Sequence, residues 1–447
     1  MKKAALHNLG CKVNAYETEA MQQILEQAGY EIVPFHERAD VYVINTCSVT
    51  NMADRKSRQM LHKAKKTNPE AIVIAAGCYV QTKEDEVALD ESIDIVIGNN
   101  KKHMLLDAIE AYEKKRQGNE TEKVNETEKV NEVVDINHVK QDYEELHLEK
   151  TAEHTRAFLK VQDGCNQFCS YCIIPFARGR VRSRKAEDVL AEVERLAAHG
   201  YQEVVLTGIH LSSYGVDTGD DLLHLIELVH GVEQIKRIRL GSLEPRIVTE
   251  DFVKRLSELE KICPHFHLSL QSGCDTVLKR MNRRYDTKEY EAGCALLRKY
   301  FSHPAITTDV IVGFPGETEE EFQMTREYLE RIHFYEMHIF KYSKREGTKA
   351  AVMPDQVDEQ EKTRRSAILL ELEKKMSDQF RMDYVEKQVT VLLEEAMEWN
   401  GKTYFTGYTK EYVKVAVETK ENLANQFVTG TIKGQLTDGV LELMVEF

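Results

Sequence analysis

The first hundred residues alternate short apolar runs with stretches in which apolar residues recur three or four positions apart. Glu17–Gly29 and Asn51–Thr67 have this helical spacing, and runs of strand length flank them. Such an alternation is typical of βαβ units and therefore predicts a parallel sheet. The predicted strands are Lys3–His7, Asp40–Asn45, Ala71–Ala75 and Ile93–Ile97.

The same rhythm restarts at Arg156. Apolar runs again alternate with helical patterns, which predicts an open, partial (β/α)6 barrel with parallel strands. The predicted strands are Phe158–Gln162, Glu203–Thr207, Arg237–Gly241, His265–Leu270, Ile306–Val312 and Glu336–Lys341.

The end of the chain has a different pattern. A long charged helical stretch, Gln356–Lys387, precedes alternating segments with hairpin signals at Asn400-Gly401 and Asp438-Gly439. This pattern predicts a small antiparallel β-barrel, a fold that often binds RNA through exposed aromatic and basic side chains. The candidates are Tyr404, Phe405, Tyr408, Lys410, Tyr412 and Lys414.

Between the first two regions, Glu113–Lys150 is polar, highly charged and poor in aromatic residues. It contains a tandem hexapeptide, Asn119–Val124 and Asn125–Val130, each reading Asn-Glu-Thr-Glu-Lys-Val. This composition predicts a charged spacer without chemistry of its own. The predicted α/β architecture is an N-terminal parallel-sheet domain (1–113), a linker (114–150), the partial barrel (151–377) and the small barrel (378–447).

Composition narrows the class of protein. The 447 residues carry a net charge of −15, which argues against wholesale coating of nucleic acid but allows a local basic groove. No run of about eighteen apolar residues predicts a membrane span, and the N-terminus lacks the pattern of a secretory signal, so we expect a cytoplasmic protein. Nine cysteines in such a protein indicate metal or redox chemistry rather than disulfides.

The most informative stretch is Cys165-Asn166-Gln167-Phe168-Cys169-Ser170-Tyr171-Cys172, with C-x3-C-x2-C spacing. Thiolates suit iron–sulfur clusters and zinc, but a structural zinc ion needs four protein ligands. Three ligands on one loop favour a 4Fe–4S cluster with one iron free to bind a small molecule. A zinc knuckle or three unrelated buried thiols are the alternatives. The loop follows the first barrel strand, at the carboxyl edge where barrel sites form.

Three more cysteines each follow one of the first three predicted strands. They are Cys11, Cys47 and Cys78. Because parallel strands end at the same edge of a sheet, these thiols are expected to converge and to hold a second cluster. The alternative is three buried thiols at strand ends.

The Cys165–Cys172 loop resembles the signature of the radical S-adenosylmethionine (SAM) superfamily, in which the open iron chelates the methionyl group. Tyr171 occupies a commonly aromatic position of that signature. The resemblance implies that Gly313, Pro315 and Gly316 contact the adenine. It also implies that Thr207-Gly208 lies near the methionyl amine.

The first domain resembles the methylthiotransferase family. Three segments carry this resemblance: Gly10-Cys11-Lys12-Val13-Asn14-Ala15-Tyr16-Glu17, Asn45-Thr46-Cys47-Ser48-Val49-Thr50 and Gly77-Cys78. It implies that Cys11, Cys47 and Cys78 hold an auxiliary 4Fe–4S cluster. The first segment is most similar to the type that acts on N6-threonylcarbamoyladenosine at position 37 of tRNA. The C-terminal segment resembles a TRAM domain, an RNA-binding module.

The resemblance implies two 4Fe–4S clusters, SAM, and a 5′-deoxyadenosyl radical that takes hydrogen from adenine C2 before sulfur and a methyl group are added. Radical chemistry is needed because an aromatic C–H bond has neither an acidic proton nor a leaving group. The implied partners are the tRNA anticodon stem-loop and an electron donor such as flavodoxin or ferredoxin, while the sulfur donor stays unspecified. The alternatives are isopentenyladenosine in tRNA, a ribosomal protein side chain, or a non-catalytic iron–sulfur carrier.

Other polar and sulfur-containing residues have less specific patterns. Arg178, Arg180, Arg182 and Arg184 occur at every second position, which in an extended segment predicts one cationic face for RNA phosphate or a set of surface ion pairs. Cys263, Cys274 and Cys294 follow no ligand spacing and are predicted core residues. His7, His210 and His267 are predicted to lie in the core or to support a site rather than to bind metal.

Overall fold

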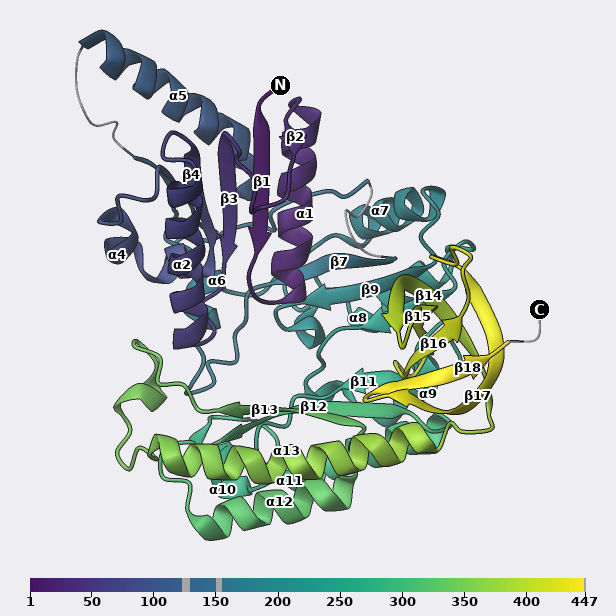
Figure 1. Cartoon of the computed structure of the whole chain (residues 1–447). Coiled ribbons are helices and arrows are strands. Elements are labelled where there is room, and N and C mark those ends of the chain that lie inside the picture. The colour runs from purple at the N-terminus through teal and green to yellow at the C-terminus, as the bar shows by residue number, and fades with distance from the viewer. Residues whose placement is uncertain (123–128, 150–154, 446–447) are drawn as a thin grey trace.

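The computed structural model describes residues 1–122, 129–149 and 155–445. The first domain is a six-stranded, fully parallel sheet in the order β2-β1-β3-β4-β5-β6 (Figure 1). Its strands are β1 (Lys3–Asn8), β2 (Glu31–Ile32), β3 (Val41–Thr46), β4 (Ile72–Gly77), β5 (Ile95–Ile97) and β6 (Val130–Glu132).

Helices cover both faces of this sheet, which explains why its central strands are apolar on both sides. Side chains of α1 (Lys12–Gln27) and α5 (Leu105–Glu122) pack on one face, and those of α2 (Asn51–Thr67) pack on the other. Two short helices, α3 (Cys78–Thr82) and α4 (Glu84–Ala88), follow β4.

Part of the predicted linker belongs to the packed structure. Val130–Glu132 adds strand β6 beside β5, while Leu146 and Leu148 are buried in the core of the partial barrel. The prediction of a plain spacer is therefore wrong for these residues, because a few apolar positions within a charged stretch are enough to pair and pack. Residues 123–128 of the tandem hexapeptide lie outside the described residues.

The central domain confirms the predicted open barrel. Its strands run parallel in two hydrogen-bonded groups, β10-β9-β7 and β11-β12-β13, and isolated parallel bridges such as Leu243–Leu268 join the groups. They are β7 (Arg156–Asp163), β9 (Glu203–Gly208), β10 (Arg237–Leu240), β11 (His265–His267), β12 (Ala305–Val312) and β13 (Glu336–Lys341).

The helices of this domain lie outside the arc of strands, and β8 (Arg182–Ser183) pairs antiparallel with β7 (Figure 1). Capping boxes at Asp286 and Thr318 mark the starts of α11 and α12, because each side chain accepts a hydrogen bond from a free N–H group of the first helical turn. The helices are α6 (Ile174–Arg178), α7 (Ala186–Ala198), α8 (Leu222–His230), α9 (Glu250–Ser257), α10 (Asp275–Arg280), α11 (Thr287–Tyr300), α12 (Glu319–Ile332) and α13 (Glu359–Met382). Short 3₁₀ helices span Lys102–Met104, Leu211–Ser213, Pro245–Ile247 and Lys349–Val352.

The C-terminal segment closes into a small barrel in the order β14-β15-β16-β18-β17. All neighbours are antiparallel except β16 and β18, whose parallel pairing closes the ring. Its strands are β14 (Gln388–Trp399), β15 (Lys402–Tyr408), β16 (Lys414–Glu418), β17 (Phe427–Thr437) and β18 (Val440–Met444).

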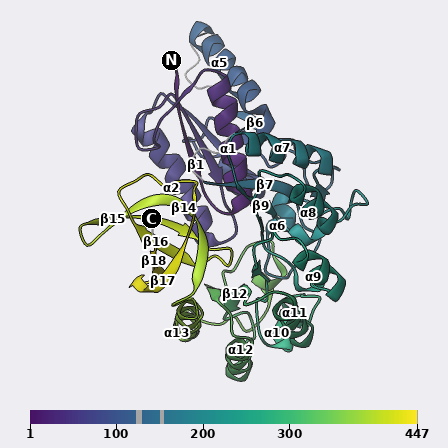
Figure 2. The same cartoon turned by 90° about the vertical axis from the view of Figure 1, so that its right-hand side faces the viewer.

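The small barrel packs against the amino ends of the central strands. Arg237 and Arg239 at the start of β10 donate hydrogen bonds to backbone carbonyls of the small barrel, and Arg156 at the start of β7 pairs with Glu394 at 2.7 Å. In both views the N-terminal sheet lies above the partial barrel, and the small barrel covers one end of it (Figures 1 and 2). The carboxyl ends of the central strands thus face the first domain. Among the described helices, none has the length and apolar character that a membrane crossing requires.

Candidate active site

The structure brings the three cysteines of the first domain to one edge of the sheet, as predicted. Cys11 caps α1 after β1, Cys47 follows β3 and Cys78 opens α3 after β4. Since β1, β3 and β4 are neighbours, the three thiols come from adjacent strand ends. Gly10, at φ +110°, lets the chain pass so close to Cys47 that a Cβ there would lie 3.0 Å from the Cys47 sulfur.

The second group of cysteines lies on a loop that is tied down at several points. The backbone N–H of Cys165 donates to Gly179 O (3.0 Å), and that of Cys172 donates to Cys169 O (3.0 Å). The Arg283 guanidinium donates to Cys169 Sγ at 3.2 Å, so a cation faces this loop. Positive charge near a group of thiols suits the thiolate form that metal binding requires.

Burial shapes the chemistry of the buried thiols in both groups. It raises the pKa of Cys47 and of Cys165 to about 11, and that of Cys172 to about 12. Neighbouring cysteines add to the rise. Iron ions remove this penalty by binding the thiolates directly. The donor sets therefore fit two iron–sulfur clusters, each with three protein ligands.

A short polar bridge holds the two cysteine groups near each other. The Asn99 amide donates to Ala177 O in α6 at 2.8 Å and to Cys78 Sγ at 3.5 Å. Helix α6 begins two residues after Cys172, and α3, which Cys78 opens, packs against α6. Asn99 thus joins the first-domain thiols to the segment that follows the Cys165–Cys172 loop.

The residues predicted to surround SAM lie at the same carboxyl edge of the central strands. Thr207 and Gly208 end β9, and Gly313 follows β12, where its N–H donates to Glu317 at 2.6 Å. Glu317 is in turn paired with Arg365 at 2.7 Å, which fixes the loop. Gly313, Pro315 and Gly316 form its tight turn, in which both glycines have positive φ. Tyr171 packs edge-on against Phe314 of this loop, with 6.5 Å between the two ring centres.

The row of arginines is not a surface face. Arg178, Arg182 and Arg184 are buried, so both sequence interpretations, an RNA face and surface ion pairs, are wrong for them. Arg180 alone of the four is exposed, over the Phe168 ring at 4.6 Å. Regular spacing was misleading because Arg178 lies in α6 rather than in an extended segment.

A buried charge network that the sequence did not suggest joins the first domain to the partial barrel. Glu17 of α1 pairs with Arg178 (2.8 Å), Lys160 (2.8 Å) and Lys102 (3.1 Å), and Asp163 pairs with Arg178 (3.2 Å). Burial alone would raise the pKa of Glu17, but Arg178 and the two lysines hold it well below its usual range. In the sequence, the polar residues within the otherwise apolar strand β7 were the one indication of this buried charge network.

The remaining predictions have mixed outcomes. Cys263, Cys274 and Cys294 are buried, as expected for core residues. Of the RNA-binding candidates, Tyr404 and Phe405 are buried in the small barrel. Tyr408 and Tyr412 stack on each other at 4.4 Å and lie against Arg156, so they face the central domain.

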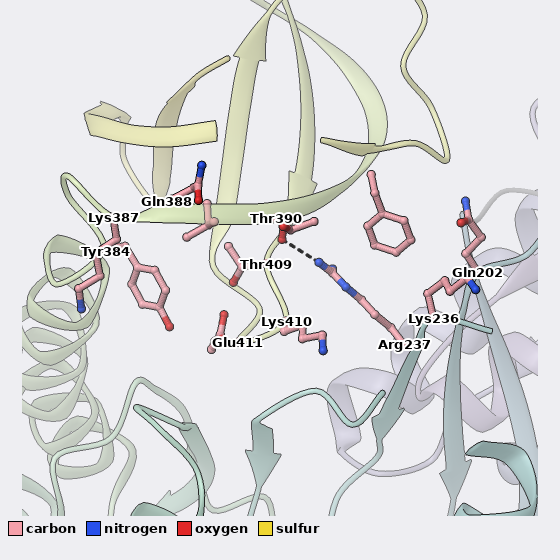
Figure 3. Close-up of a pocket in the computed structure, with 12 residues that line it drawn as sticks. Gln202, Lys236, Arg237, Tyr384, Lys387, Gln388, Thr390, Thr409, Lys410 and Glu411 are labelled. Carbon is pink, nitrogen blue, oxygen red and sulfur yellow. Dashed lines mark hydrogen bonds between the residues drawn. The ribbon is translucent and has the colours of Figure 1, made fainter. Parts of the chain in front are cut away.

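A hollow of about 660 Å³ lies where the small barrel meets the central domain. Figure 3 shows Arg237 reaching across it to donate to Thr390 O, at 2.7 Å. Its charged lining residues are mostly cations: Lys236, Arg237, Lys387 and Lys410 against Glu411. Net positive charge makes this hollow suited to an anion.

Two family models and one solved structure show which class of protein this chain resembles. Residues 159–329 match the Radical SAM superfamily, and residues 3–98 match Uncharacterized protein family UPF0004. The fold is shared with TsrM of Kitasatospora setae, a radical SAM methyltransferase solved with cobalamin and a 4Fe–4S cluster, at a TM-score of 0.55 and 15% identity over 79% of this chain and 74% of that chain. The chain is therefore a radical SAM protein.

Curated relatives narrow the class further. The threonylcarbamoyladenosine tRNA methylthiotransferase MtaB of Bacillus subtilis is 42% identical over 96% of this chain and 93% of its own length. MtaB of Thermotoga maritima is 36% identical over 99% of this chain and 96% of its own. The tRNA-2-methylthio-N(6)-dimethylallyladenosine synthase of Thermoanaerobacter sp. is 36% identical over 87% of this chain and 81% of its own length.

This chain belongs to the radical SAM tRNA methylthiotransferases. The predicted family is confirmed, and with it an enzyme that uses SAM and 4Fe–4S clusters. The assignment of individual residues to these cofactors stays a prediction.

Proposed function

We propose that this protein methylthiolates C2 of N6-threonylcarbamoyladenosine at position 37 of tRNA, beside the anticodon. The observation that supports the proposal is the contact of Asn99 both with Cys78 of the first trio and with Ala177, five residues beyond the last cysteine of the second trio. Two relatives named for this substrate are 42% identical to this chain, whereas the dimethylallyladenosine synthases compared with it are at most 36% identical, which favours threonylcarbamoyladenosine. It is also favoured over a ribosomal protein side chain, because the relatives named above act on tRNA.

Each part of the chain has a role in this proposal. Cys165, Cys169 and Cys172 hold one cluster, and Tyr171, Thr207, Gly208, Gly313, Pro315 and Gly316 surround SAM. Cys11, Cys47 and Cys78 hold the auxiliary cluster. Bound cofactors supply the radical and the sulfur, while the protein aligns them with the base and excludes water. Since C2 is stacked within the loop, the target nucleotide must be turned outward to react.

We further propose the partners and layout that this reaction requires. Residues 1–113 present the auxiliary cluster, residues 151–377 form the SAM-binding core, and residues 378–447 form a TRAM-like module for the anticodon stem-loop. A flavodoxin or ferredoxin in the cytoplasm supplies electrons. Three arginines link the small barrel to the amino ends of the core strands, which supports this division of labour.

The variant Cys47→Ala tests the auxiliary cluster. Because it removes one of three ligands, we expect iron content to fall by about four atoms per chain, the content of one cubane. Methylthiolation should cease while 5′-deoxyadenosine is still formed. Cys294→Ala is the matched control, since Cys294 is also buried but lies in helix α11. Unchanged iron in Cys47→Ala would refute the assignment.

Nucleoside mass spectrometry of tRNA from a deletion strain tests the substrate. We expect 2-methylthio-N6-threonylcarbamoyladenosine to be replaced by its unmethylthiolated precursor, and to return when the gene is restored. Loss of the methylthiolated dimethylallyl nucleoside instead, or no change in tRNA, would contradict the proposed substrate.

A further inference from the structure

Two histidines and an aspartate gather on three neighbouring strands of the central domain. They are His267 on β11, Asp309 on β12 and His338 on β13, strands that lie side by side in Figure 1. His267 Nε2 lies 3.3 Å from the Asp309 carboxylate, and its ring stacks on that of His338 at 5.8 Å. One polar atom of each lies within 4.8 Å of the others.

All three side chains point to the inner side of the arc. The residues next to them on the same strands, Phe266, Val310 and Met337, belong to the hydrophobic core beneath the outer helices. Because successive strand residues point to opposite faces, the three polar side chains face the lumen of the partial barrel. His338 is exposed there, so its ring can meet a bound molecule.

The cluster lies close to the predicted reaction centre. Arg283 donates to Cys169 Sγ at 3.2 Å and, with its other terminal nitrogen, to Ser269 O at 3.1 Å. Ser269 is two residues beyond His267, which corresponds to roughly 7 Å along an extended chain. His267 therefore lies two residues before the carbonyl that Arg283 joins to the Cys165–Cys172 loop.

The amino end of the lumen contains ion pairs, Arg239 with Glu203 at 3.0 Å and Arg156 with Glu394 at 2.7 Å. His265 shares the inner face with His267, and burial together with nearby cations, Arg239 first among them, holds the pKa of His265 well below its usual range. Arg156 and Arg239 lie over the Tyr412 ring, on which His265 stacks at 4.9 Å. The lumen is thus lined by polar and charged groups, which favours a polar substituent over an apolar one.

We propose that His267, Asp309 and His338 recognise the threonylcarbamoyl substituent of the target adenine. This inference rests on the proposed function. His267 is held by Thr307 Oγ1 (3.0 Å from Nδ1) and by Asp309, so it orients the aspartate, and the substituent offers a carboxylate, a hydroxyl and urea N–H groups to the His338 imidazole and the Asp309 carboxylate. A dimethylallyl group offers only C–H bonds, so it could not pair with the exposed His338 ring or the partly exposed Asp309 carboxylate, and sites built from hydrogen-bonding groups discriminate against apolar analogues.

The test compares binding of synthetic anticodon stem-loops to anaerobic, cluster-loaded protein. The stem-loops carry threonylcarbamoyladenosine, dimethylallyladenosine or adenosine at position 37. For His338→Phe we expect about tenfold weaker binding of the threonylcarbamoyl stem-loop, the order expected for a lost hydrogen bond to a charged group, and unchanged binding of the other two. His338→Gln, which keeps an N–H donor, should recover part of the difference.

His224→Phe is the matched control, because His224 is also an exposed histidine beside an aspartate, Asp220, but on the outer helix α8. Equal loss for all three stem-loops, or no loss, in His338→Phe would overturn the inference. So would a stoichiometric metal, additional to the clusters, that His338→Phe loses. Failure of the proposed function is distinct: the wild-type protein would then methylthiolate no threonylcarbamoyl stem-loop.

Discussion

Arg178 shows how strongly a single side chain can couple the two halves of this site. Its guanidinium is fully buried and contacts Glu17 and Asn14 of the first domain as well as Asp163 of the central domain. Burying charges is costly unless each has partners, and removing Arg178 takes away the strongest counter-ion of Glu17 and one of the three cations that face Asp163.

We expect Arg178→Met to lower the free energy of unfolding by about 3–5 kcal/mol, the usual cost of breaking a buried ion pair. Urea titration of the cluster-loaded protein measures it. Arg180→Met is the control, since Arg180 is two residues away but exposed, and should change stability by less than about 1 kcal/mol. Equal effects of the two substitutions would contradict the role of the network.

The sequence predicted those residues whose chemistry depends on local spacing. The Cys165–Cys172 loop has its three thiols within eight positions, and Cys11, Cys47 and Cys78 each follow a recognisable strand. The partners of Arg178 could not be found in this way, because Glu17 lies 161 positions away and resembles any helical glutamate. The triad of His267, Asp309 and His338 likewise exists only through strand pairing.

At the scale of elements, the loop that carries Cys165 depends on one close backbone approach. Gly164 has φ +71°, and a Cβ there would lie only 1.9 Å from Arg180 O. The turn is therefore restricted to glycine both by its backbone angle and by the lack of space. The apolar pattern predicted strand β7 but gave no sign of this contact.

Gly164→Ala should displace the loop and remove about four irons per chain, because one cluster loses its ligand geometry. Iron analysis and the charge-transfer absorption of the reconstituted protein measure the loss. Gly200→Ala is the matched control, since Gly200 also has positive φ (+91°) but has nothing within 4 Å of an added Cβ. Full iron content in Gly164→Ala would show that the loop tolerates the shift.

On the scale of the whole molecule, basic side chains line the hollow between the small barrel and the central domain. Lys236 and Lys387 are exposed there, and among the described residues Glu411 is the one acid that lines it. The net charge of −15 thus conceals a local positive surface. Composition predicted that such a groove was possible, but its place depends on how two domains meet.

We expect the double variant Lys236→Gln/Lys387→Gln to bind tRNA more weakly and to flatten the dependence of log affinity on log salt by about one unit per lysine. Affinity titrations at several salt concentrations measure this slope. Lys254→Gln/Lys299→Gln, on the outer helices α9 and α11, is the control pair. An unchanged slope in the first variant would place the RNA elsewhere.

The seam between the first domain and the core has one more consequence. Four cations, Lys102, Lys160, Arg178 and Arg182, face three buried carboxylates, Glu17, Asp163 and Glu144. Cys78 lies close enough for a negative charge on its sulfur to stabilise the Arg178 cation. A cluster bound through Cys78 would therefore also stabilise the interface between the first domain and the central domain. Newly synthesised protein without iron should have a weaker interface, and we expect proteases to cleave this junction first.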